Sequence, residues 1–181
     1  MPRNKPRLHL ALYARPKYPD SYHYALLITE KPTNLSQNLS ATKFHALNTL
    51  QNISGKLSNP WRYECSEIAD LNDEHRLLLC VTIAKVLDLE AVVRLLETVP
   101  VYQSDDLDQA KARRFDCVTW VREALGRLAD SKAVASLESF SAAERIALQY
   151  VERKKRESRW SGRARPGVPI FDALTGREVA G

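Results

Sequence analysis

The order of the hydrophobic patterns constrains this chain most, because strand-like segments fill its first half and helical segments its second half. Alternating or continuous apolar runs predict about five strands, at residues 7–14, 22–29, 43–50, 61–68 and 76–86. The last run is nearly continuous and β-branched at its end, which is typical of a central strand. Such segregation of strands and helices predicts an α+β fold with a mostly antiparallel sheet.

Helical periodicity and capping residues predict three helices in the second half. Each follows or contains a side chain that can cap its first turn: residues 89–98 after Asp88, a helix from Cys117 after Asp116, and a helix reaching about Glu157 whose start is marked by Ser141 and Glu144. Residues 105–114 are polar and predict a loop or a short exposed helix. Because apolar residues recur at helical spacing behind Asp116, Cys117 falls in the first turn of its helix.

The chain length of 181 residues fits one domain, which we expect to span residues 1–160. Residues 161–181 are rich in glycine and proline and predict a loop-like extension, with an apolar patch at 168–174 that packs on the domain. The three widely spaced cysteines give no metal-ligand pattern and cannot all pair, which indicates reduced thiols and a cytoplasmic location. No stretch reaches the roughly 20 apolar residues of a membrane span.

The sequence contains no glycine-rich phosphate-binding loop, no His-Glu-x-x-His and no Cys-x-x-Cys motif. We therefore expect no metal and no cofactor.

Cys117 is the best candidate for a nucleophile. Cysteine reacts as the thiolate, and the unpaired N–H groups at a helix start favour that anion. We therefore expect a lowered pKa for the Cys117 thiol, and the same N–H groups could stabilise an oxyanion. Core packing is the competing interpretation, because cysteine is among the most buried residue types. Cys65 and Cys80 lie within strand patterns, where a buried cysteine is an inert apolar side chain.

A thiol nucleophile needs a base, and the four histidines are the candidates. His23 and His45 lie in neighbouring predicted strands. His75 falls in a polar turn, and His9 lies in the first strand, where we expect no catalytic role. Two strand histidines together with a helix-start cysteine favour a catalytic set, but the sequence leaves open whether the three side chains converge.

Two short motifs carry a resemblance to a known superfamily. The segment YHYALLI at 22–28 places a histidine in an early strand, and FDCVTWV at 115–121 opens a later helix with a cysteine. This order resembles the circularly permuted papain-like proteins, namely the lecithin:retinol acyltransferase-like and PPPDE-type branches of the NlpC-type peptidase superfamily. It is also similar to fungal proteins of this size. The resemblance covers about residues 8–128.

The resemblance implies a permuted papain-like core in which His23 is the base, Cys117 the nucleophile and His45 the residue that orients the base. It further implies thiol-dependent cleavage or transfer of acyl groups on peptides, isopeptides or lipids. The connection between His23 and His45 is longer than the short hairpin expected from the family, so Asn48 is an alternative for the third role.

Three residues are candidates for the wall of a substrate pocket. Trp120 lies three residues after Cys117, Tyr22 precedes His23, and Asn48 follows the strand of His45. For Trp120, core packing is the more common role of a tryptophan.

The net charge of +5 is concentrated near the C-terminus, in the run Arg153, Lys154, Lys155 and Arg156. Such a run is typical of a site for an anionic partner such as tRNA or a lipid headgroup. The competing interpretation is a solvated helix end whose cations complement the helix dipole.

Three hypotheses for the function follow. The first is a thiol-dependent hydrolase or acyltransferase that acts on an amide, ester or thioester. The second is aminoacyl transfer from charged tRNA in fungal small-molecule biosynthesis of the cyclodipeptide type. The third is a catalytically inactive binding module whose basic helix contacts RNA or another anion.

Overall fold

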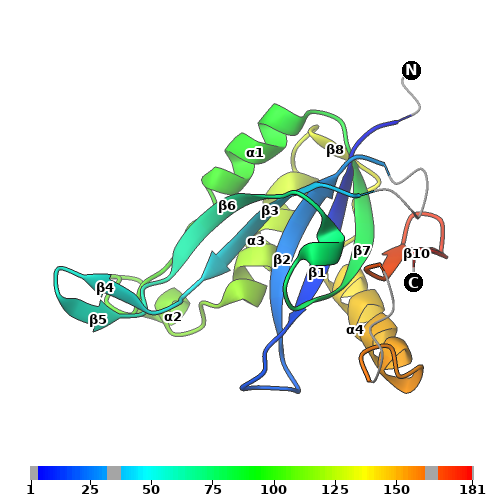
Figure 1. Ribbon diagram of the computed structural model, residues 1–181. Helices are drawn as coiled ribbons and strands as arrows, with labels where there is room; N and C mark the ends of the chain where they lie inside the picture. The colour runs from blue at the N-terminus through cyan, green and yellow to red at the C-terminus, as the bar shows by residue number, and fades with distance from the viewer. Residues whose placement is uncertain (1–3, 32–37, 162–166, 181) are drawn as a thin grey trace.

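The computed structural model describes residues 4–31, 38–161 and 167–180. Its main feature is an eight-stranded, mostly antiparallel sheet (Figure 1). The five strands expected from the sequence form most of it: β1 (Arg7–Ala14), β2 (Tyr22–Thr29), β3 (Ala41–Leu47), β6 (Arg62–Ile68) and β7 (Leu77–Val86). The spatial order is β10-β9-β7-β1-β2-β3-β6, with β8 (Val134–Ala135) also paired to β7. The α+β class with a mostly antiparallel sheet is therefore confirmed, and β7 is an interior strand.

A two-stranded hairpin interrupts the path from β3 to β6. It consists of β4 (Gln51–Ile53) and β5 (Lys56–Ser58) and projects away from the body of the molecule (Figure 1). Its turn residues Ser54 and Gly55 both have positive φ, 51° and 82°, as a tight hairpin turn requires. We expected the third strand at 43–50, but it ends at Leu47, and part of the expected turn at 55–60 is strand β5.

The helices lie close to their expected positions. They are α1 (Leu89–Glu97), α2 (Gln109–Ala112), α3 (Cys117–Ala129) and α4 (Phe140–Arg156), with a 3-10 turn, η1, at Leu71–Asp73. Asp88 and Asp116 cap α1 and α3 as expected. The start of α4 was placed wrongly: its N-cap is Ser139, whose hydroxyl accepts from the N–H of Ala142, so Ser141 and Glu144 lie inside the helix.

The C-terminal tail packs on the domain as part of the sheet and not as a loop. Strand β9 (Ile170–Asp172) pairs with β7 in parallel, and β10 (Arg177–Ala180) pairs with β9. The loop-like interpretation of this tail was therefore wrong for 170–172 and 177–180. Residues 162–166 and 181 of the predicted extension lie outside the described residues.

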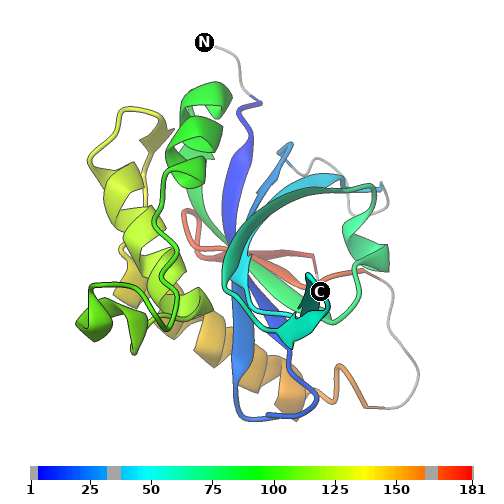
Figure 2. The same ribbon diagram turned by 90° about the vertical axis from the view of Figure 1, so that its left-hand side faces the viewer.

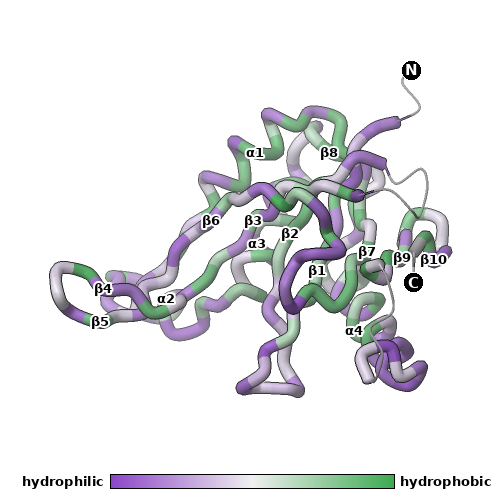
Figure 3. The backbone as a smooth tube through the Cα atoms, in the orientation of Figure 1, coloured by the Kyte–Doolittle hydropathy of each residue, from purple (hydrophilic) through white to green (hydrophobic). Residues whose placement is uncertain are grey.

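Two apolar clusters lie on opposite faces of the sheet. The larger joins α1, α3 and α4 to one face, and strand side chains such as Tyr24, Leu26 and Phe44 belong to it. The smaller lies on the other, concave face and contains Ala25 and Leu27 (Figure 2). Successive strand residues therefore alternate between the two clusters. The hydropathy pattern agrees: the central strands are largely apolar, and the end of α4 is hydrophilic (Figure 3).

None of the helices in the described part of the chain combines the length and the apolar character needed to span a membrane.

Candidate active site

Cys117 is the first residue of α3, and a reciprocal pair of hydrogen bonds fixes that helix start. The N–H of Thr119 donates to Oδ1 of Asp116 at 2.7 Å, and the N–H of Asp116 donates to Oγ1 of Thr119 at 2.8 Å. Such a capping box satisfies backbone donors that a helix start otherwise leaves open. The expected place of Cys117 in the first helical turn is confirmed, and only 4% of this residue is exposed.

Strands β2 and β3 separate beside Cys117. Their pairing runs from Thr29–Ala41 to Leu26–Phe44 and stops there. Beyond that point β2 continues along β1 and β3 continues along β6, so the two strands diverge with α3 behind the opening (Figure 1). The backbone N–H of Tyr24 hydrogen-bonds to the Cys117 sulfur. The N-terminal residue of α3 therefore reaches the backbone of β2, next to His23.

His23 and His45 meet where the two strands diverge. Nε2 of His23 lies 2.7 Å from Nδ1 of His45, and Nε2 of His45 lies 3.4 Å from Oε1 of Glu64, the residue paired with it on β6. The structure thus brings the two strand histidines into contact, which the sequence left open.

The chain of contacts also determines where the protons lie. An ionised carboxylate only accepts hydrogen bonds, so Glu64 requires a proton on Nε2 of His45. Nδ1 of the neutral His45 ring must then accept from Nε2–H of His23. This leaves Nδ1 of His23 unprotonated and without a hydrogen-bond partner among the described residues. An imidazole in this tautomer can take a proton at Nδ1.

Burial keeps both rings neutral. It lowers the pKa of His23 to about 3, and the positive charges of protonated His45, Arg15 and Lys43 act in the same direction. The pKa of His45 is also lowered, by burial first and then by Lys43, against the opposing effect of Glu64. His23 is therefore a neutral imidazole across the physiological pH range.

The lowered pKa expected for Cys117 is not what the structure gives. Burial raises the pKa of the thiol, and Asp116 adds to this effect. The backbone N–H groups of Tyr24 and of Cys117 itself, together with Arg15, act in the opposite direction without cancelling the burial. The loss of hydration on burial destabilises the thiolate more than the backbone N–H groups at the helix start stabilise it. Cys117 is therefore a neutral thiol at neutral pH.

The expected hydrogen bond between Cys117 and His23 is not formed. Cys117 belongs to the cluster on the helix side, with Tyr24. His23 has the parity of Ala25, so its imidazole is directed to the other face of β2. No hydrogen bond joins the thiol to either histidine within the described residues. The structure thus brings Cys117 to the strand backbone beside His23, but the thiol and Nδ1 of His23 are not hydrogen-bonded to each other.

The two remaining cysteines differ from each other. All three thiols are free. Cys80 is buried as expected, and burial raises its pKa to about 12. Cys65, expected to be buried, is exposed on β6.

The other histidines behave as the sequence suggested. His75 is exposed in the turn before β7. His9 is fully buried and hydrogen-bonds to Thr29 and Thr82, which fits a structural role.

The three candidates for a pocket wall have different positions. Trp120 is fully buried in the core against Tyr63, and its Nε1 has no partner in the part of the chain that the structure describes. Asn48 is exposed beyond the end of β3, whereas His45 contacts His23. Tyr22 is half-buried at the start of β2, with Nζ of Lys155 at 5.4 Å from its ring.

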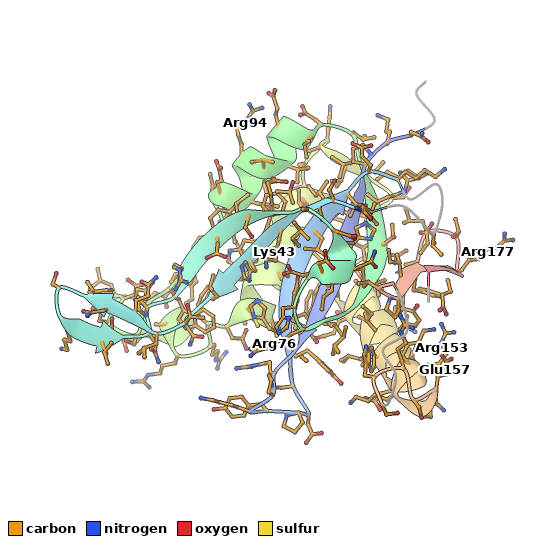
Figure 4. The ribbon with its side chains drawn as sticks, viewed as in Figure 1. Lys43, Arg76, Arg94, Arg153, Glu157 and Arg177 are labelled. Atoms are coloured by element: carbon orange, nitrogen blue, oxygen red, sulfur yellow. The ribbon has the colours of Figure 1, made fainter. Side chains whose placement is uncertain are left out.

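Most of the basic run on α4 is neutralised within the molecule. Arg153 and Lys154 both bind Glu178, at 2.7 and 2.5 Å, and Lys155 binds Glu152 at 2.8 Å. Figure 4 shows Arg153 beside Glu157 at the end of this helix. Lys154 is buried despite its charge. Contacts with carboxylates and a position in the last helical turn both fit the interpretation as a helix end.

Sequence reasoning missed Glu64 and Arg15. Glu64 lies on the strand face opposite Tyr63, and only its register against His45 reveals its role. Arg15 follows β1 directly and acts electrostatically on both His23 and Cys117. The described residues contain no group of three or more histidine, cysteine, aspartate or glutamate side chains arranged to hold a metal ion.

Together these features define an α+β protein with a cysteine at a helix start and paired histidines on adjacent strands. A family model described as "Family of unknown function (DUF6914)" matches residues 5–180, and the chain belongs to this family. No curated protein and no solved structure gave a significant match to the chain.

Proposed function

We propose that this protein is a thiol-dependent acyl-transfer enzyme in which Cys117 is the nucleophile, His23 the base and His45 the residue that orients the base. The observation that carries the proposal is the chain Glu64–His45–His23, which leaves Nδ1 of His23 unprotonated beside the strand backbone that Cys117 contacts. The order of these elements also supports a permuted papain-like core, which is part of the proposal.

Because the Cys117 thiol and the His23 imidazole are both neutral, proton transfer accompanies the attack. The thiol transfers its proton to Nδ1 of His23 as sulfur attacks the substrate carbonyl, and N–H groups of the first turn of α3 stabilise the oxyanion. The leaving group departs with the proton from His23, and a thioester forms on Cys117. Water, an amine or an alcohol then gives its proton to His23 and attacks the thioester, and the sulfur recovers that proton.

The proposal requires the thiol and Nδ1 of His23 to come within hydrogen-bond distance when a substrate binds. Catalytic hydrogen bonds are often long in ligand-free structures and shorten in the complex. Cys117 and the His23 imidazole lie on opposite faces of β2, so this approach requires the Tyr22 end of β2 to turn, and that end no longer pairs with β3.

The free thiols support a reducing, cytoplasmic environment. Three of the four basic residues in the run 153–156 pair with carboxylates, so no contact among the described residues favours the tRNA-dependent or binding-module alternatives.

Intact mass after incubation with an activated ester such as p-nitrophenyl acetate tests the proposal. We expect one acetyl adduct, lost in Cys117→Ala and retained in Cys80→Ala and Cys65→Ala. An adduct that persists in Cys117→Ala, or the absence of any adduct at Cys117, would contradict it.

A further inference from the structure

The connection between β1 and β2 places a cation at the candidate site. The last cross-strand pairs are Tyr13–His23 and Ala14–Tyr22, so Arg15 is the next residue after the pair beside His23. The guanidinium carbon of Arg15 lies 5.1 Å from the centroid of the Tyr18 ring, within the distance at which a guanidinium stacks on an aromatic face. The turn bond from the N–H of Tyr18 to the carbonyl of Arg15, at 2.8 Å, shapes the same loop.

Arg15 is exposed, and no carboxylate pairs with it among residues 4–31, 38–161 and 167–180. Asp116 and Glu144 are already engaged by other groups. Asp116 caps α3, and Glu144 accepts from the hydroxyl of Tyr24 at 3.2 Å. The five donors of the Arg15 guanidinium therefore remain available to an oxyanion from outside.

A second cation approaches from α4. Nζ of Lys155 lies 5.4 Å from the centroid of the Tyr22 ring, although Glu152 also binds it at 2.8 Å. Both cations border the start of β2, where Cys117 reaches the strand backbone. The positive charge of Arg15 favours the thiolate of Cys117 and disfavours the protonated form of His23. An anion bound here would lie near both reacting groups.

We propose that Arg15 binds an anionic group of the acyl substrate, and that this substrate carries a carboxylate or phosphate close to the carbonyl that Cys117 attacks. The inference rests on the proposed function and adds the class of substrate.

Alkylation by iodoacetate and iodoacetamide tests this inference, because the two reagents differ mainly in charge. The rates are measured by mass spectrometry at Cys117 and at exposed Cys65 of the same full-length protein. In the wild type, the iodoacetate-to-iodoacetamide ratio should be higher at Cys117 than at Cys65. The Arg15→Gln variant should lower the ratio at Cys117 about fivefold, the effect of one unit charge at about 4 Å in water, and leave Cys65 unchanged.

Three controls sharpen the test. Arg15→Lys keeps the charge and should retain most of the ratio, whereas Arg94→Gln, on exposed α1 away from the β1–β2 loop, should not change it (Figures 1 and 4). The iodoacetate-to-iodoacetamide ratio at Cys117 of the wild type should fall as salt rises from about 0.01 to 0.15 M, because the Debye length shortens from about 30 to 8 Å. Protection of Cys117 by inorganic phosphate or by acetate identifies which oxyanion is preferred.

The possible outcomes separate the two proposals. An unchanged ratio in Arg15→Gln, with Cys117 still forming the acetyl adduct, overturns the anion site and leaves the acyl-transfer proposal intact. Failure of Cys117 to react with either alkylating reagent and with the ester overturns both.

Discussion

Each end of β2 lies beside a histidine ring, but His9 at one end is fully buried whereas His23 at the other is half-buried. At the Thr29 end, β2 pairs with β1 on one side and β3 on the other, and His9 is enclosed between Thr29 and Thr82. At the Tyr22 end, β2 keeps only β1, and His23 faces the point where β3 has moved away.

The hydrogen bonds of the two rings show what this difference means. The Thr29 hydroxyl donates to the carbonyl of Glu30 at 2.6 Å, so it accepts from Nε2–H of His9, and Nδ1 accepts from Thr82. Both nitrogens of His9 are used, whereas the chain from Glu64 leaves Nδ1 of His23 unpaired among the described residues. Burial lowers the pKa of both rings to about 3. The pKa therefore does not distinguish the two rings, whereas the unpaired Nδ1 of His23 does, and this is why we propose His23 and not His9 as the base.

Replacement of His23 should have the largest effect on activity. We expect His23→Ala to lower kcat/KM for ester cleavage by about 10²–10⁴-fold, because the thiol would lose its proposed base. The acetyl adduct on Cys117 should form correspondingly slowly, as stopped-flow or timed mass measurements would show.

The matched change at the other end is His9→Gln, which should leave kcat/KM within about threefold, since His9 contacts neither Cys117 nor His23. Equal losses in the two variants would remove the distinction between the two ends of β2. A normal far-UV spectrum of His23→Ala is the folding control.

For the free energy of unfolding, replacement of His9 should have the large effect. His9→Ala removes a fully buried ring and leaves the Thr29 and Thr82 hydroxyls without their partner, so we expect a loss of about 3 kcal/mol. Urea denaturation measures it. Exposed His75→Ala is the control and should stay within about 0.5 kcal/mol of the wild type. A loss below about 1 kcal/mol for His9→Ala would show that the enclosed end contributes little to the fold.

The pH dependence of the free energy of unfolding reports on His9 at the Thr29 end of β2. The folded pKa of His9, about 3, lies below the ordinary histidine pKa of 6.5, so the unfolded chain binds more protons between these values. Stability therefore rises with pH across this window and falls on acidification. From pH 7 to 5, His9 should account for a loss of about 2 kcal/mol. His9→Gln should show a correspondingly shallower slope in urea titrations, and identical slopes would contradict the assignment.

The sequence predicts the parts of the fold and site that depend on local patterns. Alternating or continuous apolar runs located five of the eight strands of the sheet, and the cap at Asp116 placed Cys117 at a helix start. The short strands β9 and β10 were missed, because three or four residues give no clear period and the pairing of β9 with β7 is non-local.

The geometry of the site depends on tertiary features that no local pattern reports. The contact between His23 and His45 requires β2 and β3 to pair and then to separate at Leu26–Phe44. The pKa of Cys117 was predicted in the wrong direction because the helix start is visible in the sequence, whereas the burial of the sulfur is not.

The smallest effect we predict concerns Glu64, which contacts His45 at the Tyr22 end of β2. Its contact with His45 is long, 3.4 Å, and its side chain is 41% exposed, so its charge is screened. Glu64→Gln should lower kcat/KM by no more than about fivefold, the range of an exposed ion pair. A glutamine oxygen can still accept from Nε2–H of His45 and preserve the tautomer, whereas Glu64→Leu cannot. A larger loss in Glu64→Leu than in Glu64→Gln, with unchanged KM, would indicate that Glu64 acts by orienting the histidine pair. Equal activities in the two variants would show that the tautomer of His23 is set without Glu64.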